Sequence, residues 1–157
     1  MTDTPYTNKD LEKLLCNHLG TRKLQIYTLS HFRKGVHIKK MFKNDNFIIV
    51  FLDNPKTGIG HWNTILQIED TVYELFDSFG TDSGYDKTPI YEAFKRARFK
   101  LIENKEPIQQ KDTNVCGKHC ILRINARHKP FHEFIKIYDN NSLSPDQLAM
   151  TLVALEL

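Results

Sequence analysis

The run Phe47-Ile48-Ile49-Val50-Phe51-Leu52 is continuously apolar and ends at the turn-forming triplet Asp53-Asn54-Pro55. A short apolar run that is closed by turn residues is typical of a β-strand buried on both faces. Two more β-rich runs follow at residues 61–69 and 72–76, and the polar pair Asp70-Thr71 joins them. The three runs therefore predict an antiparallel meander at the centre of the fold.

Helical patterns flank this meander in the sequence. We expect helices at residues 8–19, 89–98 and 116–127, and a further strand at residues 99–103. A last helix should begin at Ser144-Pro145, because serine is a good N-cap and proline suits the first helical position. Helices that flank a central, mostly antiparallel sheet define an α+β fold. No repeat or Pro/Gly-rich linker divides residues 1–157, so we expect a single domain.

The charge of the chain is nearly balanced but unevenly distributed. It carries 22 Lys and Arg against 19 Asp and Glu, a formal net charge of +3 that is no evidence for nucleic-acid binding. Between residues 22 and 43, however, there are seven basic residues and no acidic one, namely Arg22, Lys23, Arg33, Lys34, Lys39, Lys40 and Lys43. This stretch predicts a basic face, which is either a DNA contact or simply a solvated surface.

The cysteines indicate a reducing compartment. Cys16, Cys116 and Cys120 are odd in number and unevenly spread, so we expect free thiols and no disulfide framework. The first residues lack the apolar run of a signal peptide, and no run is long enough for a membrane span, so we expect neither secretion nor membrane insertion. A metal site built from Cys116, Cys120, His119 and His128 is disfavoured, because Cys-x3-Cys without a second paired cluster is weak evidence.

Cys116 is the candidate nucleophile. If a helix begins near it, with Thr113 or Asn114 as the cap, the thiol lies where unpaired N–H groups and the helix dipole favour a thiolate. The following residue, Gly117, leaves the backbone uncrowded, so that local N–H groups can bind the oxygen of a substrate carbonyl. This context is typical of a cysteine that forms covalent intermediates.

His61 and Asp77 are the candidate partners of this nucleophile. His61 begins a predicted strand after Gly58-Ile59-Gly60 and precedes the only tryptophan, Trp62. Asp77 follows the next strand, within Phe76-Asp77-Ser78-Phe79-Gly80. If the two strands pair, the start of one lies beside the end of the other, and the aspartate can bind the imidazole and fix its tautomer.

The order His61-Trp62, Phe76-Asp77-Ser78-Phe79-Gly80, glutamine and Cys116-Gly117 resembles a known clan of cysteine proteases. The clan includes adenain, the adenovirus maturation protease, and the SUMO-deconjugating proteases, and the resemblance covers roughly residues 61–124. It implies a papain-like, adenain-like fold and hydrolysis of a peptide bond through a thioester. In that chemistry Cys116 is the nucleophile, His61 the base and Asp77 the residue that orients the base.

The resemblance also implies a glutamine side chain that stabilises the oxyanion. Gln110 is assigned to this role because it lies six positions before Cys116, with Gln109 as the fallback. The chemistry needs no metal and no cofactor, although adenain-like enzymes are stimulated by DNA and by a viral peptide joined through a disulfide. The basic stretch fits the DNA contact, whereas the peptide link is unsupported, since no cysteine lies between Cys16 and Cys116.

Within the clan the chain resembles the viral branch, because it lacks the length for the extended surface that holds a ubiquitin-like protein. This implies a monomeric endopeptidase that cleaves capsid or core precursor proteins in the virion or infected cell, after small residues in Gly-Gly or Gly-Ala contexts. Asp77, where adenain has glutamate, instead matches the deconjugating branch. Three alternatives stay open: a SUMO-type deconjugating protease, an effector acetyltransferase of the same clan, and a non-catalytic DNA-binding packaging protein.

Overall fold

The structure is a computed structural model that describes residues 7, 9–10, 13, 26–53, 60–110, 113–139 and 142–155. The helix predicted at residues 8–19, apart from positions 9, 10 and 13, lies outside the described residues, as do Cys16, Arg22 and Lys23. Thr7 and Asp10 exchange the reciprocal bonds between backbone N–H and side chain that are typical of a helix start.

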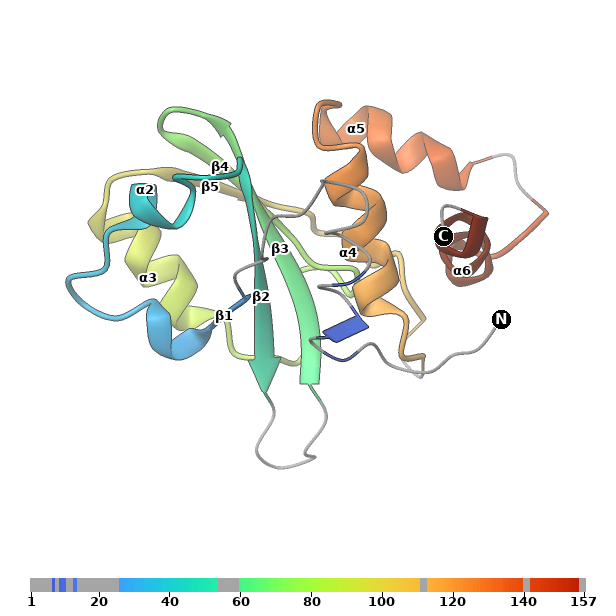
Figure 1. Ribbon diagram of the computed structural model, residues 1–157, viewed down its shortest axis with the longest axis horizontal. Coiled ribbons are helices and arrows are strands. Elements are labelled where there is room, and N and C mark those ends of the chain that lie inside the picture. The colour runs from blue at the N-terminus through green and yellow to red at the C-terminus, as the bar shows by residue number, and fades with distance from the viewer. Residues whose placement is uncertain are drawn as a thin grey trace.

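A five-stranded sheet with strand order β1-β2-β3-β4-β5 forms the centre of the molecule (Figure 1). Its strands are β1 (Ile26–Thr28), β2 (Phe47–Asp53), β3 (Gly60–Glu69), β4 (Val72–Phe76) and β5 (Lys100–Glu103). Strands β2, β3 and β4 pair in antiparallel fashion, which confirms the predicted meander. Strands β1 and β5 add to its edges in parallel, so the sheet is mixed, and the predicted antiparallel character holds only for the central strands. The reason is that each edge strand is reached by a crossover connection rather than by a hairpin.

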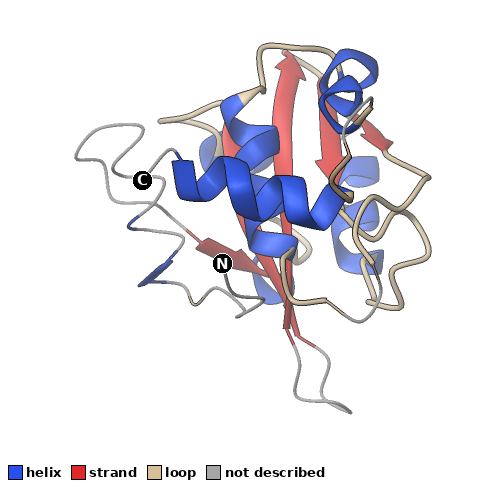
Figure 2. Cartoon of the chain, turned by 90° about the vertical axis from the view of Figure 1, so that its right-hand side faces the viewer, coloured by secondary structure: helices blue, strands red, loops and turns tan. Residues whose placement is uncertain are grey.

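Helices cover both faces of this sheet, as Figures 1 and 2 show. On one side lie α2 (Ile38–Met41) and α3 (Thr88–Arg96), and on the other α4 (Cys116–Asn125), α5 (Phe131–Phe134) and α6 (Pro145–Leu155), with short 3-10 turns η1 (Leu29–His31) and η2 (Ile135–Tyr138). The α+β class and the helices and strand predicted after residue 88 are thereby confirmed to within a few residues.

Strand β2 shows why its sequence is apolar at every position. Ile48, Val50 and Leu52 pack in the core that includes α3, whereas Phe47 and Ile49 pack in the core that includes α4. Because successive side chains of a strand point to opposite faces, a strand covered on both sides requires apolar residues throughout.

Helix α4 is anchored on the sheet by a buried ion pair. The Arg123 guanidinium donates to both carboxylate oxygens of Glu74 in β4, at 2.7 and 3.0 Å, and also to the carbonyls of Ala126 and Lys129. Every residue of α4 from Cys116 to Ile124 is buried. The position of the first residue of this helix is therefore set by contacts along its whole length.

Helix α6 begins as the sequence predicts. Gln147 N–H donates to the Ser144 hydroxyl, and Ser144 N–H donates to the Gln147 side chain, which is a reciprocal N-terminal cap. In the part of the chain that the structure describes, no helix is both long enough and apolar enough to cross a membrane.

Candidate active site

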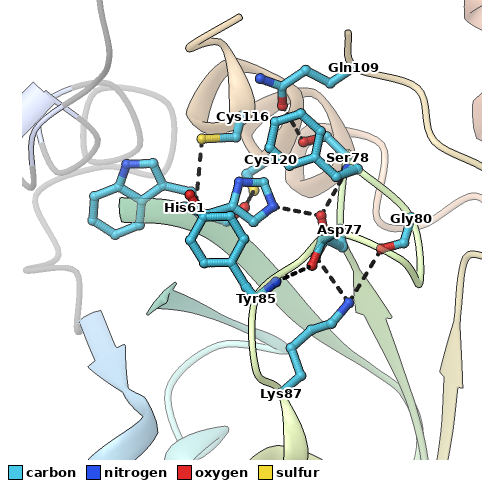
Figure 3. A network of polar contacts seen from close by, with 12 residues as sticks. His61, Asp77, Ser78, Gly80, Tyr85, Lys87, Gln109, Cys116 and Cys120 are labelled. Atoms are coloured by element: carbon cyan, nitrogen blue, oxygen red, sulfur yellow. Dashed lines mark hydrogen bonds and ion pairs between the residues drawn. The ribbon is translucent and has the colours of Figure 1, made fainter. Parts of the chain in front are cut away.

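The start of β3, the end of β4 and the start of α4 meet at one end of the sheet. Thr64 pairs with Phe76, so one further step of the same register places Asn63 opposite Asp77. His61 is then the diagonal neighbour of Asp77 on the same face, within reach of its side chain. His61 Nε2 lies 2.6 Å from Asp77 Oδ1, and both side chains are fully buried (Figure 3). The predicted proximity of these two residues is confirmed.

Asp77 is held by four neighbours. Its Oδ1 also accepts from Phe79 N–H at 2.8 Å, and its Oδ2 accepts from the buried Lys87 ammonium at 3.1 Å. The Asn104 side chain binds the Asp77 backbone twice, accepting from its N–H at 2.9 Å and donating to its carbonyl at 2.6 Å. Burial alone raises the pKa of Asp77, but the hydrogen bond and charge of His61 and the charge of Lys87 outweigh it and lower that pKa. Asp77 is therefore an anion.

The environment of His61 favours its charged form. Burial lowers the pKa of His61, but the interactions with Asp77 and Cys116 outweigh it and raise that pKa to about 9. The second ring nitrogen, Nδ1, is buried and has no hydrogen-bond partner within the usual distance among the described residues. Its interaction is with Cys116. The rings of Phe79 and Tyr85 stack on the imidazole, with centroids 4.5 and 4.9 Å away. These rings fix the plane of the imidazole and keep water from it.

Cys116 is the first residue of α4, as the sequence predicts. The predicted cap was wrong: Val115 is the N-cap, and no side chain caps the helix. The Thr113 hydroxyl instead donates to the Gln110 carbonyl and to Asp146, and it accepts from Gln109 Nε2. Lys118 N–H and His119 N–H bond to the Val115 carbonyl, so the N–H groups of Cys116 and Gly117 are the ones at this helix start that can bind a substrate oxygen.

The two buried cysteines both bond to the backbone of Trp62 in β3. Trp62 N–H donates to Cys116 Sγ at 3.5 Å, and Cys120 Sγ donates to the Trp62 carbonyl at 3.4 Å (Figure 3). Burial, and next the charge of Cys116, raise the pKa of the Cys120 thiol well above its usual value. Cys120 is thus a packing thiol, whereas the Cys116 sulfur lies at the start of a helix and accepts from the Trp62 N–H.

The glutamine at the site is Gln109, and Gln110 was the wrong choice. Gln110 is exposed, and its backbone N–H binds Asp146 at 3.1 Å. Gln109 is buried, its Oε1 accepts from the Ser78 hydroxyl at 2.6 Å, and its Nε2 donates to the Thr113 carbonyl at 2.9 Å. The backbone N–H of Gln109 also binds the Ser78 carbonyl, which turns its side chain inward, whereas the next residue faces solvent. Figure 3 shows Gln109 and Ser78 on the Cys116 side of the network.

The turn after β4 ties these groups together. Gly80 N–H closes the turn on the Asp77 carbonyl at 2.9 Å, and the Gly80 carbonyl accepts from Lys87 at 3.3 Å. Gly80 has a φ of +75°, and a Cβ there would lie 2.4 Å from the Lys105 carbonyl oxygen. Only glycine fits this turn.

The remaining candidates lie elsewhere. His119 is fully buried and bonded on both ring nitrogens, to Asp146 and to the Tyr138 hydroxyl. Among the described residues, no cluster of three His, Cys, Asp or Glu side chains is arranged to hold a metal ion.

Five residues of the basic stretch are described, and all five are exposed, namely Arg33, Lys34, Lys39, Lys40 and Lys43. Lys39 binds Asp70 at 2.9 Å, in the turn between β3 and β4. That turn lies at the opposite end of β3 from His61, so Lys39 lies away from the Cys116 site. A DNA contact here stays a prediction.

Comparison with known proteins places the chain near one viral relative. No family model matches the sequence. The chain is 28% identical over 120 residues to a Sputnik virophage protein named "Uncharacterized protein V9", covering 63% of this chain and 69% of the virophage protein. Among solved structures, the central domain of the Lpg1148 protein from Legionella pneumophila has a TM-score of 0.45 at 12% identity, covering 98% of this chain and 97% of that domain.

Proposed function

We propose that this chain is a cysteine endopeptidase with a papain-like, adenain-like fold and the triad Cys116, His61 and Asp77. The observation that carries the proposal is the buried imidazole between Asp77, 2.6 Å away, and the thiol at the first residue of α4. A nucleophile, a base within reach and a carboxylate that orients the base are the components of covalent hydrolysis.

The reaction follows from the polarity of these groups. The Cys116 thiolate attacks the scissile carbonyl, and the oxygen that becomes negative is bound by the first N–H groups of α4 and by Gln109 Nε2. His61 then donates its Nδ1 proton to the leaving amine as the C–N bond breaks, which leaves a thioester. Water then attacks the thioester carbonyl and gives one proton to His61. The C–S bond breaks, the acid product keeps the other proton of the water, and the Cys116 thiolate and the His61 imidazolium are restored. Throughout, Asp77 keeps the Nε2 proton in place.

The geometry also supports a preference for small residues beside the scissile bond. Cys116 is only 7% exposed and lies against the buried Trp62. A substrate can reach the Cys116 sulfur only if the residues on either side of its scissile bond have small side chains, as in the Gly-Gly and Gly-Ala contexts expected from the sequence.

The biological setting that we propose is virion maturation, with capsid or core precursor proteins as substrates. The similarity to a virophage protein supports a viral setting. The exposed basic residues between Arg33 and Lys43 support DNA as a partner, and its affinity should fall steeply with salt concentration.

A Gly-Gly-X peptide vinyl sulfone tests the proposed activity. We expect a single covalent adduct, located on Cys116 by mass spectrometry, in the absence of DNA or in its presence. The absence of any adduct under both conditions would overturn the proposal. A probe made from a ubiquitin-like protein that ends in Gly-Gly should react no faster than the peptide. A large preference for that probe would instead favour the deconjugating alternative.

Gln109 should contribute much more than Gln110 to turnover. Removal of one oxyanion donor costs about 10²–10³ in kcat, so we expect Gln109→Ala to lose that factor. Gln110→Ala is the matched control, because its side chain is exposed, and it should stay near the wild-type rate. Cleavage of a fluorogenic Gly-Gly peptide measures both rates. A large loss in Gln110→Ala alone would return the oxyanion role to Gln110.

A further inference from the structure

A second buried histidine–carboxylate pair lies outside the proposed triad. Asp146, near the start of α6, is 5% exposed, and its Oδ1 lies 2.7 Å from His119 Nε2. The other nitrogen of that imidazole, Nδ1, lies 2.9 Å from the Tyr138 hydroxyl. Nothing in the proposed reaction uses these three groups, although their burial is costly unless they are fully bonded.

The other carboxylate oxygen of Asp146, Oδ2, binds the segment that carries Gln109. Asp146 Oδ2 accepts from Gln110 N–H at 3.1 Å and from the Thr113 hydroxyl at 3.0 Å. The two residues bound by Asp146 therefore lie on the same segment as Gln109, immediately after it and four residues after it.

The Gln109 amide is in turn clamped at both ends. Its Oε1 accepts from Ser78, and its Nε2 donates to the Thr113 carbonyl at 2.9 Å and to the Thr113 hydroxyl at 3.1 Å. These two oxygens belong to one residue and can share one N–H, which leaves the second N–H for an oxyanion. Ser78 belongs to the turn that carries Asp77, so the Oε1 end of the Gln109 amide is fixed relative to the triad. The Nε2 end is bound by Thr113, which is itself bonded to Asp146.

We propose, on the basis of the proposed function, that Asp146 is a positioning residue for the oxyanion hole. It fixes Thr113 and the Gln110 backbone so that the Gln109 amide stays directed at the developing oxyanion. His119 and Tyr138 hold the Asp146 carboxylate in the required orientation. The bonds from His119, Gln110 and Thr113 also lower the pKa of Asp146 against the opposing effect of burial, so the carboxylate stays charged.

The proposal predicts a selective loss in Asp146→Ala. We expect kcat/KM to fall about 10- to 100-fold, less than the loss of the donor itself, because a misplaced donor keeps part of its effect. The affinity for a Gly-Gly peptide aldehyde should fall by a similar factor, since its adduct places an oxygen in the oxyanion hole. The rate at which iodoacetamide alkylates Cys116 should not change, because that reaction needs no oxyanion donor. Asp146→Asn should recover most of the activity, since its oxygen can still accept from Gln110 and Thr113.

A double-variant comparison separates positioning from a general structural role. In the Gln109→Ala background, Asp146→Ala should cost nothing further in kcat/KM, because the group that it positions is gone. Full additivity, or an equal fall in the alkylation rate, would overturn the inference. If Asp146→Ala does not fold, Thr113→Val removes one link of the same clamp and must show the same pattern. A wild-type protein that forms no aldehyde adduct would overturn the proposed function and this inference together, whereas additive losses in an active protein would overturn only the inference.

Discussion

Replacement of Cys116 by alanine is expected to abolish turnover, with kcat lowered by a factor on the order of 10⁶. The reason is that the Cys116 thiol forms the thioester in the proposed reaction, and the Trp62 N–H and the N-terminus of α4 lie next to its sulfur. Alanine suits a helix start sterically and removes only the sulfur. Hydrolysis of a fluorogenic Gly-Gly peptide, with thermal unfolding to verify the fold, measures the effect.

Cys120→Ala is the matched control for this experiment. Cys120 lies one helical turn further along α4, is completely buried and has a raised pKa, so it should not react. Its replacement removes one S–H bond to the Trp62 carbonyl and should reduce activity only modestly. Loss of the vinyl sulfone adduct in Cys120→Ala, with the adduct retained in Cys116→Ala, would contradict the assignment of the nucleophile.

The positions of Cys116, His61 and Asp77 could be predicted because each stands at the end of an element with a clear pattern. Apolar runs define β2, β3 and β4, and the short turn after Glu69 fixes which strand ends meet. The helix start at Cys116 follows from the apolar pattern after it. Local patterns therefore suffice for residues whose place is set by the ends of elements.

The choice between Gln109 and Gln110 could not be made in this way. The two glutamines are adjacent, but Gln109 is buried and Gln110 is exposed, so an error of one residue moves the amide from the site to solvent. The direction is set by Ser78, which binds the backbone and side chain of Gln109 from 31 positions earlier in the chain. A spacing rule counted from Cys116 contains no information about that contact.

Lys87 and Asn104 were missed for the same reason. Lys87 reaches Asp77 from the start of α3, and Asn104 reaches it from the residue after β5. Lys87 belongs to the crossover that makes the β4–β5 pair parallel, and Asn104 directly follows the strand to which that crossover leads. No sequence signal predicted that this crossover returns beside β4. A lysine and an asparagine among many polar residues carry no pattern of their own.

Asp77→Asn is expected to lower kcat/KM by about 10⁴, because the imidazole would lose its orienting anion. The surroundings make this asparagine unfavourable in either orientation. Asp77 Oδ1 accepts from His61 and from Phe79 N–H, while Oδ2 accepts from the Lys87 ammonium. An asparagine must therefore turn its NH₂ group either toward the ammonium or toward His61, where it would favour the wrong tautomer.

The pH profile distinguishes this loss of orientation from a loss of stability. In the wild-type protein the pKa of His61 is raised to about 9, so the imidazolium is present below that pH and is lost as the pH rises through it. We expect kcat/KM to hold to about pH 9 and to fall above it. In Asp77→Asn the carboxylate is gone while burial still lowers the pKa of His61, so the alkaline limb should move to lower pH.

A second substitution tests whether the Lys87 ammonium causes the difficulty. In Asp77→Asn/Lys87→Met the asparagine can turn its NH₂ group away from His61 without facing a positive charge. The double variant should therefore be more active than Asp77→Asn alone, although Lys87→Met on its own removes a stabilising partner of Asp77. Such coupling is expected of two side chains that share one buried network. If the double variant loses the sum of both single effects and the alkaline limb stays near pH 9 in every variant, Asp77 does not orient His61 through this network.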